Sequence, residues 1–176
     1  KLAGIELVQA YRREYGARWI SVLPGNLYGP GDNFNLRNSH VVPALIRKFH
    51  EAVMRGDDSV SMWGSGAARR EFLHADDAAS GILFALQEYD SDEPLNIGAG
   101  YDITIAELAK LIADVVGFEG EILWDVSRPE GVPKKLLDSS KLFELGWAPS
   151  IPLREGIEST YAWYRKAHDG GHSIRE

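Results

Sequence analysis

Residues 24–34 read Pro-Gly-Asn-Leu-Tyr-Gly-Pro-Gly-Asp-Asn-Phe, and His40 follows six residues later. They come after the short apolar run 19–23, Trp-Ile-Ser-Val-Leu, which predicts a buried strand. Because Pro and Gly interrupt a hydrogen-bond ladder, we expect the backbone to leave the sheet here. Ligands of open α/β sheets bind beyond the carboxyl ends of strands, so this loop is a candidate wall of a binding site. The alternative is an ordinary loop in which Gly and Pro only set turns.

Strands and helices alternate along the whole chain. The apolar periodicity predicts helices over 1–15, 41–55, about 76–89, 104–116, 139–145 and from 152 onward, and strands over 18–23, 60–63, 72–74, 94–98 and 121–125. This alternation predicts an α/β fold with parallel strand pairing. The helix that starts at Thr104 is the best defined, because Thr104 and Glu107 form a capping box and Gly117 supplies a stop.

Several finer expectations concern the helices. We expect Asp76 or Asp77 to cap the third helix, whose inward side chains should be Ile82, Leu83 and Leu86. Pro152 should lie in the first turn of the last helix, and the polar tail 168–176 should fray. One face of the first helix carries Gly4, Val8, Tyr11 and Tyr15. Because the chain opens without Met inside this helical pattern, we expect it to be the second part of a longer protein.

The composition restricts the class of protein. The chain has 176 residues, a formal net charge of -7 and 44% hydrophobic residues, which suit one domain with a core. The acidic balance argues against a nucleic-acid binder, which usually carries a basic stripe. The absence of Cys excludes disulfides and thiolate metal sites. No apolar run is long enough to span a membrane and no signal peptide is evident, so we expect a soluble, cytoplasmic protein.

Histidine supplies the candidate acid–base chemistry. His40 lies between the polar loop and a helix, where its ring can face a cleft and titrate near neutral pH. On the residues alone, a capping or packing role for His40 is the favoured alternative. His74, in a short apolar strand, is expected to be a hydrogen-bonded structural residue. His50, His168 and His172 are expected to be solvated.

Basic and aromatic residues form a second group of candidates. Arg69 and Arg70 follow a Gly-rich turn and can hold a phosphate bidentately, or they are a solvated pair. Trp63 ends a strand just before that turn and can stack on a base or sugar, or it packs in the core. Lys134 and Lys135 present the same choice between phosphate binding and solvation.

Taken together, these motifs resemble those of GDP-L-fucose synthases, within the extended short-chain dehydrogenase/reductase superfamily of nucleotide-sugar epimerases and dehydratases. Motifs shared with the whole superfamily are Arg70-Glu-Phe-Leu-His-Ala-Asp-Asp77 and Asn96-Ile-Gly98. Motifs more particular to the fucose synthases are Asn26-Leu-Tyr-Gly-Pro-Gly-Asp-Asn-Phe34 and Asn38-Ser-His-Val41. The resemblance extends over nearly the whole chain.

The resemblance implies a role for each matching position. Lys1 matches the Lys of the family's Tyr-x-x-x-Lys pair, and His40 matches the His of the epimerising acid–base pair. Residues that would contact the NADP(H) cofactor are Lys1, Pro24, Gly25, Asn26, Leu27 and His40. Residues that would hold the GDP-sugar are Lys48, Trp63, Arg70 on the diphosphate, and Asp138. Lys48 stands where the family often has Arg, so the bidentate contact is lost there.

The resemblance also implies the architecture and the partners. Residues 1–27, 72–91 and 94–118 would complete a Rossmann-type cofactor domain, and residues 28–71 and 119–176 would form the substrate-binding domain. The Gly-rich turn and the catalytic Ser, Tyr and Cys would lie upstream, so the chain alone is expected to be inactive and to need a homodimer or a complementing N-terminal half. The alternatives are another nucleotide-sugar epimerase, dehydratase or reductase, and a non-catalytic dimerisation or assembly module.

Overall fold

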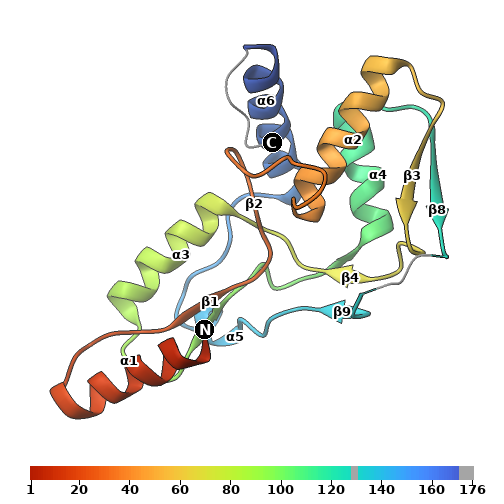
Figure 1. The fold of residues 1–176 in the computed structure, drawn as a ribbon. Helices are drawn as coiled ribbons and strands as arrows, with labels where there is room; N and C mark the ends of the chain where they lie inside the picture. The colour runs from red at the N-terminus through yellow and green to blue at the C-terminus, as the bar shows by residue number, and fades with distance from the viewer. Residues whose placement is uncertain (128–130, 171–176) are drawn as a thin grey trace.

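The computed structural model describes residues 1–127 and 131–170. Six helices appear in this part of the chain: α1 (Leu2–Tyr15), α2 (Val41–Arg55), α3 (Ala75–Glu88), α4 (Ile105–Val116), α5 (Ser140–Glu144) and α6 (Leu153–Asp169). The strands are β1 (Val22–Pro24), β2 (Leu27–Tyr28), β3 (Ser59–Trp63), β4 (Arg69–Arg70), β5 (Leu73–His74), β6 (Leu95–Ile97), β7 (Ile103–Thr104), β8 (Glu121–Asp125) and β9 (Lys134–Lys135). The predicted alternation is confirmed (Figure 1).

Parallel pairing dominates the sheets of the described residues. Strand β1 pairs with β6, β2 with β5, β3 with β8, and β4 with β9, all in parallel. The exception is β7, which lies antiparallel to β4 on the side opposite β9. The α/β class with parallel pairing that the sequence predicts is therefore confirmed, and the short strands β4, β7 and β9 form one three-stranded sheet.

The predicted first strand is displaced toward the loop. We expect a strand over 18–23 that Pro24 ends, whereas β1 runs from Val22 to Pro24, and Pro24 lies opposite Ile97. Within the described residues, β1 is hydrogen-bonded to a neighbour on only one side. The ladder tolerates Pro24 because its missing N–H costs no hydrogen bond on the unpaired side. The N–H of Gly25 still donates to the carbonyl of Ile97 at 2.9 Å before the chain departs.

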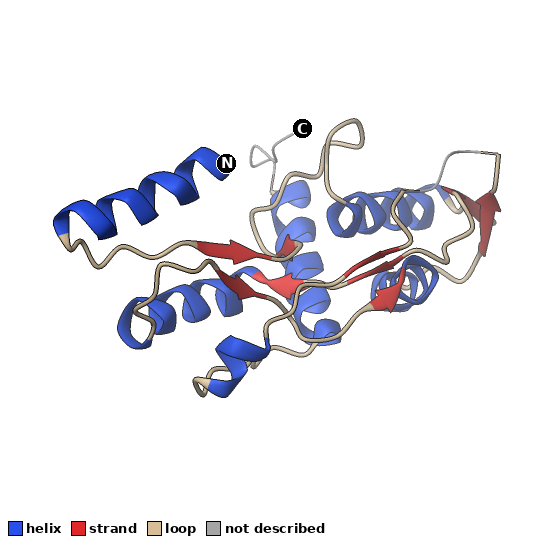
Figure 2. Cartoon of the chain, turned by 90° about the horizontal axis from the view of Figure 1, so that it is seen from below, coloured by secondary structure: helices blue, strands red, loops and turns tan. Residues whose placement is uncertain are grey.

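Two hydrophobic clusters hold the chain together. The larger cluster packs α2, α4 and α6 against β3 and β8. The smaller cluster joins α3 and α5 to β5 and β6. Helix α1 contributes no buried residue to either cluster, and Figure 2 shows it lying along the outside of the molecule. Its exposed apolar residues include Leu2, Leu7 and Tyr15, and polar contacts of Gln9 with the Asp92 carbonyl and of Arg12 with Asp90 at 2.6 Å attach it.

Most predicted helix limits are confirmed. Helix α2 begins and ends where the periodicity predicts, and Gly56 closes it in the left-handed conformation. Helix α4 starts with the predicted capping box, in which the N–H of Glu107 donates to the Thr104 hydroxyl and the Thr104 N–H donates to the Glu107 carboxylate. Pro152 is the N-cap of α6 rather than a residue of its first turn.

The cap and the buried face of α3 differ from the prediction. His74, not Asp76 or Asp77, caps the helix, and its Nδ1 accepts a hydrogen bond from the Asp76 N–H at 3.2 Å. Of the three side chains predicted to face inward, Ile82 packs against the smaller cluster, which confirms that part, whereas Leu83 and Leu86 are 62% and 64% exposed. The buried face is made of small residues, because at Gly81 even a Cβ would approach Ile97 and Trp147 to 3.1 Å. Close backbone approach, and not side-chain size, therefore orients this helix.

His50 is buried rather than solvated. It is 6% exposed on α2, its Nδ1 lies 3.1 Å from the Tyr161 hydroxyl, and its ring packs against Tyr164 and His168 of α6. A seam between two helices encloses it, which the local sequence does not reveal. His168 is exposed as predicted.

Some predictions lie outside what the structure describes. These concern His172 with most of the polar tail, and residues 128–130 of the segment expected to be irregular. The described part of that segment contains β9. None of the helices in residues 1–127 and 131–170 is long and apolar enough to cross a membrane. The two-domain division drawn from the resemblance stays a prediction.

Acidification should weaken the packing of α6 on α2. Burial lowers the pKa of His50, and the nearby His168 lowers it further. Below the ordinary His pKa of about 6.5, the unfolded chain therefore binds a proton that the folded chain resists, and the free energy of unfolding falls as the pH falls. In urea titrations, the free energy of unfolding should fall less between pH 7.5 and pH 5.5 for His50→Gln than for the unchanged chain.

The control for this prediction is His40→Gln, at the other end of α2. The His40 side chain is exposed and makes no capping hydrogen bond. This variant should keep the pH dependence of the unchanged chain. An unchanged pH dependence in His50→Gln would contradict the assignment of the effect to His50.

Candidate functional site

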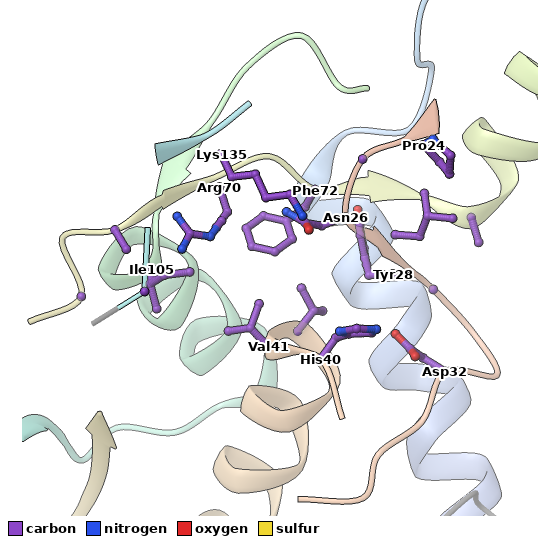
Figure 3. A pocket seen from close by; sticks show the side chains of 18 of the residues that line it. Pro24, Asn26, Tyr28, Asp32, His40, Val41, Arg70, Phe72, Ile105 and Lys135 are labelled. Atoms are coloured by element: carbon purple, nitrogen blue, oxygen red, sulfur yellow. The ribbon is translucent and has the colours of Figure 1, made fainter. Parts of the chain in front are cut away.

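A cavity of about 850 Å³ lies where the loop after β1 meets the start of α2 and the strand β4. Its wall gathers residues from segments far apart in sequence: the loop 24–32, the N-terminus of α2, the ends of β3 and β4, and β9. Figure 3 shows Arg70 and Lys135 at one side of this cavity and His40 with Asp32 at the other, with Phe72 and Asn26 between them. The loop 24–34 is therefore a wall of a cavity, as the first of the two interpretations predicts.

The carboxylate of Glu71 holds the strand ends that border the cavity. Glu71 is 1% exposed, its Oε1 accepts the Leu137 N–H at 2.7 Å, and its Oε2 accepts the Ala99 N–H at 3.0 Å. Its backbone carbonyl accepts a hydrogen bond from the Asn26 amide at 3.0 Å. Two segments are thereby fixed to the Glu71 side chain, and the third is fixed to its backbone carbonyl, which orients Asn26 at the cavity.

Glycine allows these loops to approach Glu71. A Cβ at Gly98 would lie 2.3 Å from the Glu71 Oε2, and a Cβ at Gly25 would lie 3.0 Å from its Oε1. Any side chain at Gly98 would therefore displace the carboxylate. The Asn-Ile-Gly motif thus has a structural reason for its Gly, in addition to any role at the ligand.

His40 faces the cavity from the N-terminus of α2. It occupies the N-cap position, yet its side chain makes no capping hydrogen bond, which removes the capping alternative. The ring is exposed rather than packed, and Figure 3 shows it near the carboxylate of Asp32. An exposed imidazole on a cavity wall can exchange protons with a bound molecule.

Lys1 and the loop 24–27 line the same cavity as His40. Tyr28 follows in this wall, and burial raises the pKa of its phenol. Its hydroxyl therefore stays protonated, and it donates to the Leu153 carbonyl at 3.4 Å. This contact ties the loop after β1 to the start of α6.

The basic and aromatic candidates separate into two groups. Arg69 and Lys134 both bind the carboxylate of Asp102, at 2.6 and 3.0 Å, so neither is free for a phosphate. Arg70 and Lys135 line the cavity instead. Trp63 is 71% exposed at the rim of the cavity, so the alternative that it packs in the core is wrong.

Two residues assigned to the sugar nucleotide by the resemblance do not line the cavity. Lys48 donates to the Ser61 carbonyl at 3.3 Å on the outer side of α2. Asp138 accepts the Ser140 N–H at 3.0 Å, and hydrogen bonds from Ser140 lower the pKa of its carboxyl. The geometry does not bring these two side chains to the other candidates, so their binding roles stay predictions.

Sequence reasoning missed the buried carboxylates that build the site. Besides Glu71 and Asp102, Asp77 accepts the N–H groups of Ser150 and Ile151, each at 3.0 Å, and so fixes the entry into α6. The sequence did contain one indication of such carboxylates, because acidic residues recur beside the apolar strand residues within 71–77. A carboxylate in such a setting must find buried donors, but the sequence does not say which loops supply them.

The comparison with known proteins identifies the family. Residues 1–98, more than half of the chain, match the NAD dependent epimerase/dehydratase family. This chain belongs to the NAD dependent epimerase/dehydratase family. Within it, the chain is 54% identical over 166 residues to GDP-L-fucose synthase 1 of Arabidopsis thaliana, covering 94% of this chain and 51% of that protein. It is 46% identical over 178 residues to GDP-L-fucose synthase of Escherichia coli K12, covering 96% and 56%.

Solved structures of the family agree with this placement. A GDP-L-fucose synthetase from Naegleria fowleri bound to NADP matches with a TM-score of 0.91 at 29% identity, covering 100% of this chain and 56% of that one. A GDP-6-OMe-4-keto-L-xylo-heptose reductase from C. jejuni matches with a TM-score of 0.86 at 33% identity, covering 94% and 59%. The resemblance to GDP-L-fucose synthases is confirmed, and the chain spans about half the length of the curated relatives it matches.

Replacing Glu71 should loosen the site and the fold together. Glu71→Gln removes the charge and turns an acceptor into a donor that faces backbone N–H groups. Because hydrogen bonds to a charged group contribute about 1.5–3 kcal/mol each, the free energy of unfolding should fall by about 2 kcal/mol or more in a urea titration. The matched control is Glu88→Gln on the exposed side of α3, which should change it by less than about 0.5 kcal/mol. Equal effects of the two variants would contradict this role.

Proposed function

We propose that this chain forms the substrate-facing part of a GDP-L-fucose synthase. The whole enzyme would convert GDP-4-keto-6-deoxy-D-mannose to GDP-L-fucose by epimerising C3 and C5 and then reducing C4 with NADPH. The observation that carries the proposal is the cavity itself, which brings Lys1, His40, Trp63 and Arg70 together from four separate segments. Relatives at 46–54% identity bear this enzyme's name, which supports the same conclusion.

The proposed role of His40 follows from the chemistry of a ketone. The 4-keto group makes the C–H bonds at C3 and C5 acidic, because the electron pair left by a departing proton moves onto the keto oxygen. Inversion requires removal of the proton from one face and its return on the opposite face. His40, exposed in the cavity wall, serves one face. The resemblance implies a Cys as the second acid–base residue, and this sequence contains no Cys.

The residues around the loop 24–27 fit the nicotinamide end of NADP(H). Lys1, this loop and His40 all line the one cavity, which supports the assignment of these residues to the cofactor. When bound, the cofactor supplies the hydride that reduces C4. Lys1 would bind the nicotinamide ribose, and its positive charge would lower the pKa of a neighbouring catalytic Tyr. The chain alone is not expected to bind the cofactor well.

The other side of the cavity suits a sugar nucleotide. The Arg70 guanidinium matches the geometry of diphosphate oxygens, and the exposed Trp63 offers a flat face at the rim. A cytoplasmic location and a homodimer are part of the proposal. The exposed apolar side chains of α1 support the dimer.

The same helix supports a second candidate, a non-catalytic assembly module. Its exposed Leu2, Leu7 and Tyr15 are suited to a protein contact that needs no nucleotide. This candidate predicts a stable oligomer in sedimentation experiments and no affinity for GDP-sugars. Arg70→Ala should change neither the oligomer nor the absence of GDP-sugar binding.

Turnover of GDP-4-keto-6-deoxy-D-mannose with NADPH tests the proposed function. The chain should be inactive alone and active after addition of the separately produced first half of the Arabidopsis thaliana relative. In the active mixture, His40→Asn should slow solvent deuterium incorporation at C3 and C5 by about 100-fold or more. The control His168→Asn, on α6 and outside the cavity, should leave this exchange unchanged.

The outcomes separate the candidates. No turnover in the mixture, together with no binding of GDP by the chain, would contradict the proposal and favour the assembly module. Preference for UDP or dTDP compounds over GDP compounds would indicate another nucleotide-sugar epimerase, dehydratase or reductase.

A further inference from the structure

A carboxylate lies opposite His40 in the cavity. Figure 3 shows the Asp32 side chain and the His40 ring pointing toward each other at one side of the cavity, and both residues line it. They come from different elements, because Asp32 belongs to the loop after β2 and His40 is the N-cap residue of α2. The His40 side chain makes no capping hydrogen bond, so its own helix does not fix the orientation of the ring. Asp32 is therefore a candidate for orienting it.

Local hydrogen bonds hold Asp32 in place. The chain turns sharply before it, because the Asp32 N–H donates to the Gly29 carbonyl at 3.3 Å and Gly31 has a φ of +82°. Pro30 followed by a Gly of positive φ is the arrangement that a type II turn requires. One carboxylate oxygen, Asp32 Oδ1, accepts the N–H of Asn33 at 2.7 Å. The other oxygen, Oδ2, takes no part in that bond and is available to a donor in the cavity.

A closed loop brings Asp32 and His40 to the same place. The Asn33 amide donates to the Asn38 Oδ1 at 2.9 Å, and the Asn33 Oδ1 accepts the N–H of Asn35 at 3.0 Å. These bonds tie the two ends of the loop between Asn33 and Asn38 together. The residues just outside the loop, Asp32 on one side and His40 on the other, are thereby kept close to each other.

Asp32 differs in charge from the other residues of the cavity. Of the described residues that line it, Asp32 alone is acidic, whereas Lys1, Arg70 and Lys135 are basic. A carboxylate in the wall of a site for an anionic sugar nucleotide repels the ligand unless a cation neutralises it. The protonated form of the His40 ring is such a cation. This pairing gives the acidic residue a reason to face the cavity.

We propose that Asp32 is a positioning residue for His40, which accepts a hydrogen bond from one ring nitrogen so that the other nitrogen faces the reacting carbon of the sugar. This inference rests on the proposed function and adds a residue to its acid–base step. A neutral imidazole donates from one nitrogen and accepts at the other, and the hydrogen bond of the first nitrogen decides the state of the second. Because acid–base hydrogen bonds commonly tighten only when substrate binds, we expect this bond in the substrate complex.

The proposed step moves one proton and leaves Asp32 ionised. When His40 removes the proton from the sugar carbon, the C–H electron pair moves onto the keto oxygen and the proton binds the free ring nitrogen. The ring is then an imidazolium, which the Asp32 carboxylate stabilises. Return of a proton to the sugar carbon reverses these movements, and Asp32 holds the ring in the same orientation for both.

Solvent deuterium incorporation at C3 and C5 of GDP-4-keto-6-deoxy-D-mannose tests this role in the active mixture of the chain with the first half of the Arabidopsis thaliana relative. Asp32→Asn should lower the rate at saturating substrate about tenfold or more and leave the KM within about twofold, because Asn does not stabilise the imidazolium. Asn keeps an oxygen that can accept the Asn33 N–H, so the loop should stay closed. The matched control, Asp58→Asn, removes an exposed carboxylate beyond the other end of α2, outside the cavity, and should leave the rate unchanged.

A spectroscopic measurement separates the orientation of the ring from the structure of the loop. With 15N-labelled His, the ring nitrogen shifts of His40 report which nitrogen carries the proton. They are measured in the mixture saturated with GDP-L-fucose, at alkaline pH, where a His ring is neutral. The unchanged chain and Asp58→Asn should show one dominant tautomer, whereas Asp32→Asn should populate both tautomers.

Each other result overturns a specific part of the inference. If His40→Asn stops the exchange but Asp32→Asn alters neither the rate nor the tautomer, the role of Asp32 is wrong and the proposed function stands. If Asp32→Asn raises the KM and leaves the tautomer unchanged, Asp32 contacts the substrate and does not position His40. If Asp58→Asn slows the exchange equally, the effect is one of overall charge and the role is wrong. If the mixture of unchanged halves shows no exchange, the proposed function fails and this inference fails with it.

Discussion

The buried carboxylate of Glu71 is the interaction on which the site depends. No cation in the described residues forms an ion pair with it, so backbone N–H groups of Ala99 and Leu137 compensate for its burial. A buried charge without such donors would cost several kcal/mol, so these loops cannot leave without destabilising the fold. Glu71 thereby joins the loop after β6, the segment before α5 and the wall of the cavity.

This arrangement works because the backbone approaches closely at a few positions. Gly98 and Gly25 admit the carboxylate, and Gly81 lets α3 lie directly against β6. Ile82 and Phe84 of α3 pack against the smaller cluster, whereas Leu83 and Leu86 are exposed.

Three buried carboxylates support the structure, whereas two basic side chains line the cavity. Glu71, Asp77 and Asp102 are occupied by backbone N–H groups or by neighbouring cations. Arg70 and Lys135 remain directed to the cavity, although the chain as a whole carries a formal charge of -7. A chain of acidic net charge can therefore present a basic site, because local pairing and not the total decides which charges meet a ligand.

The sequence by itself determined the α/β class, the limits of α2 and α4 and, through its resemblance to known motifs, the family. These follow from periodicity, capping residues and motif chemistry, which are local along the chain. Only the tertiary structure decided that α6 encloses His50. It also decided that Lys134 binds Asp102 while Lys135 lines the cavity. Finally, it placed Lys48 and Asp138 outside the cavity lining. Those outcomes depend on contacts between segments distant in sequence, and no local pattern records which buried donor or counter-ion a side chain meets.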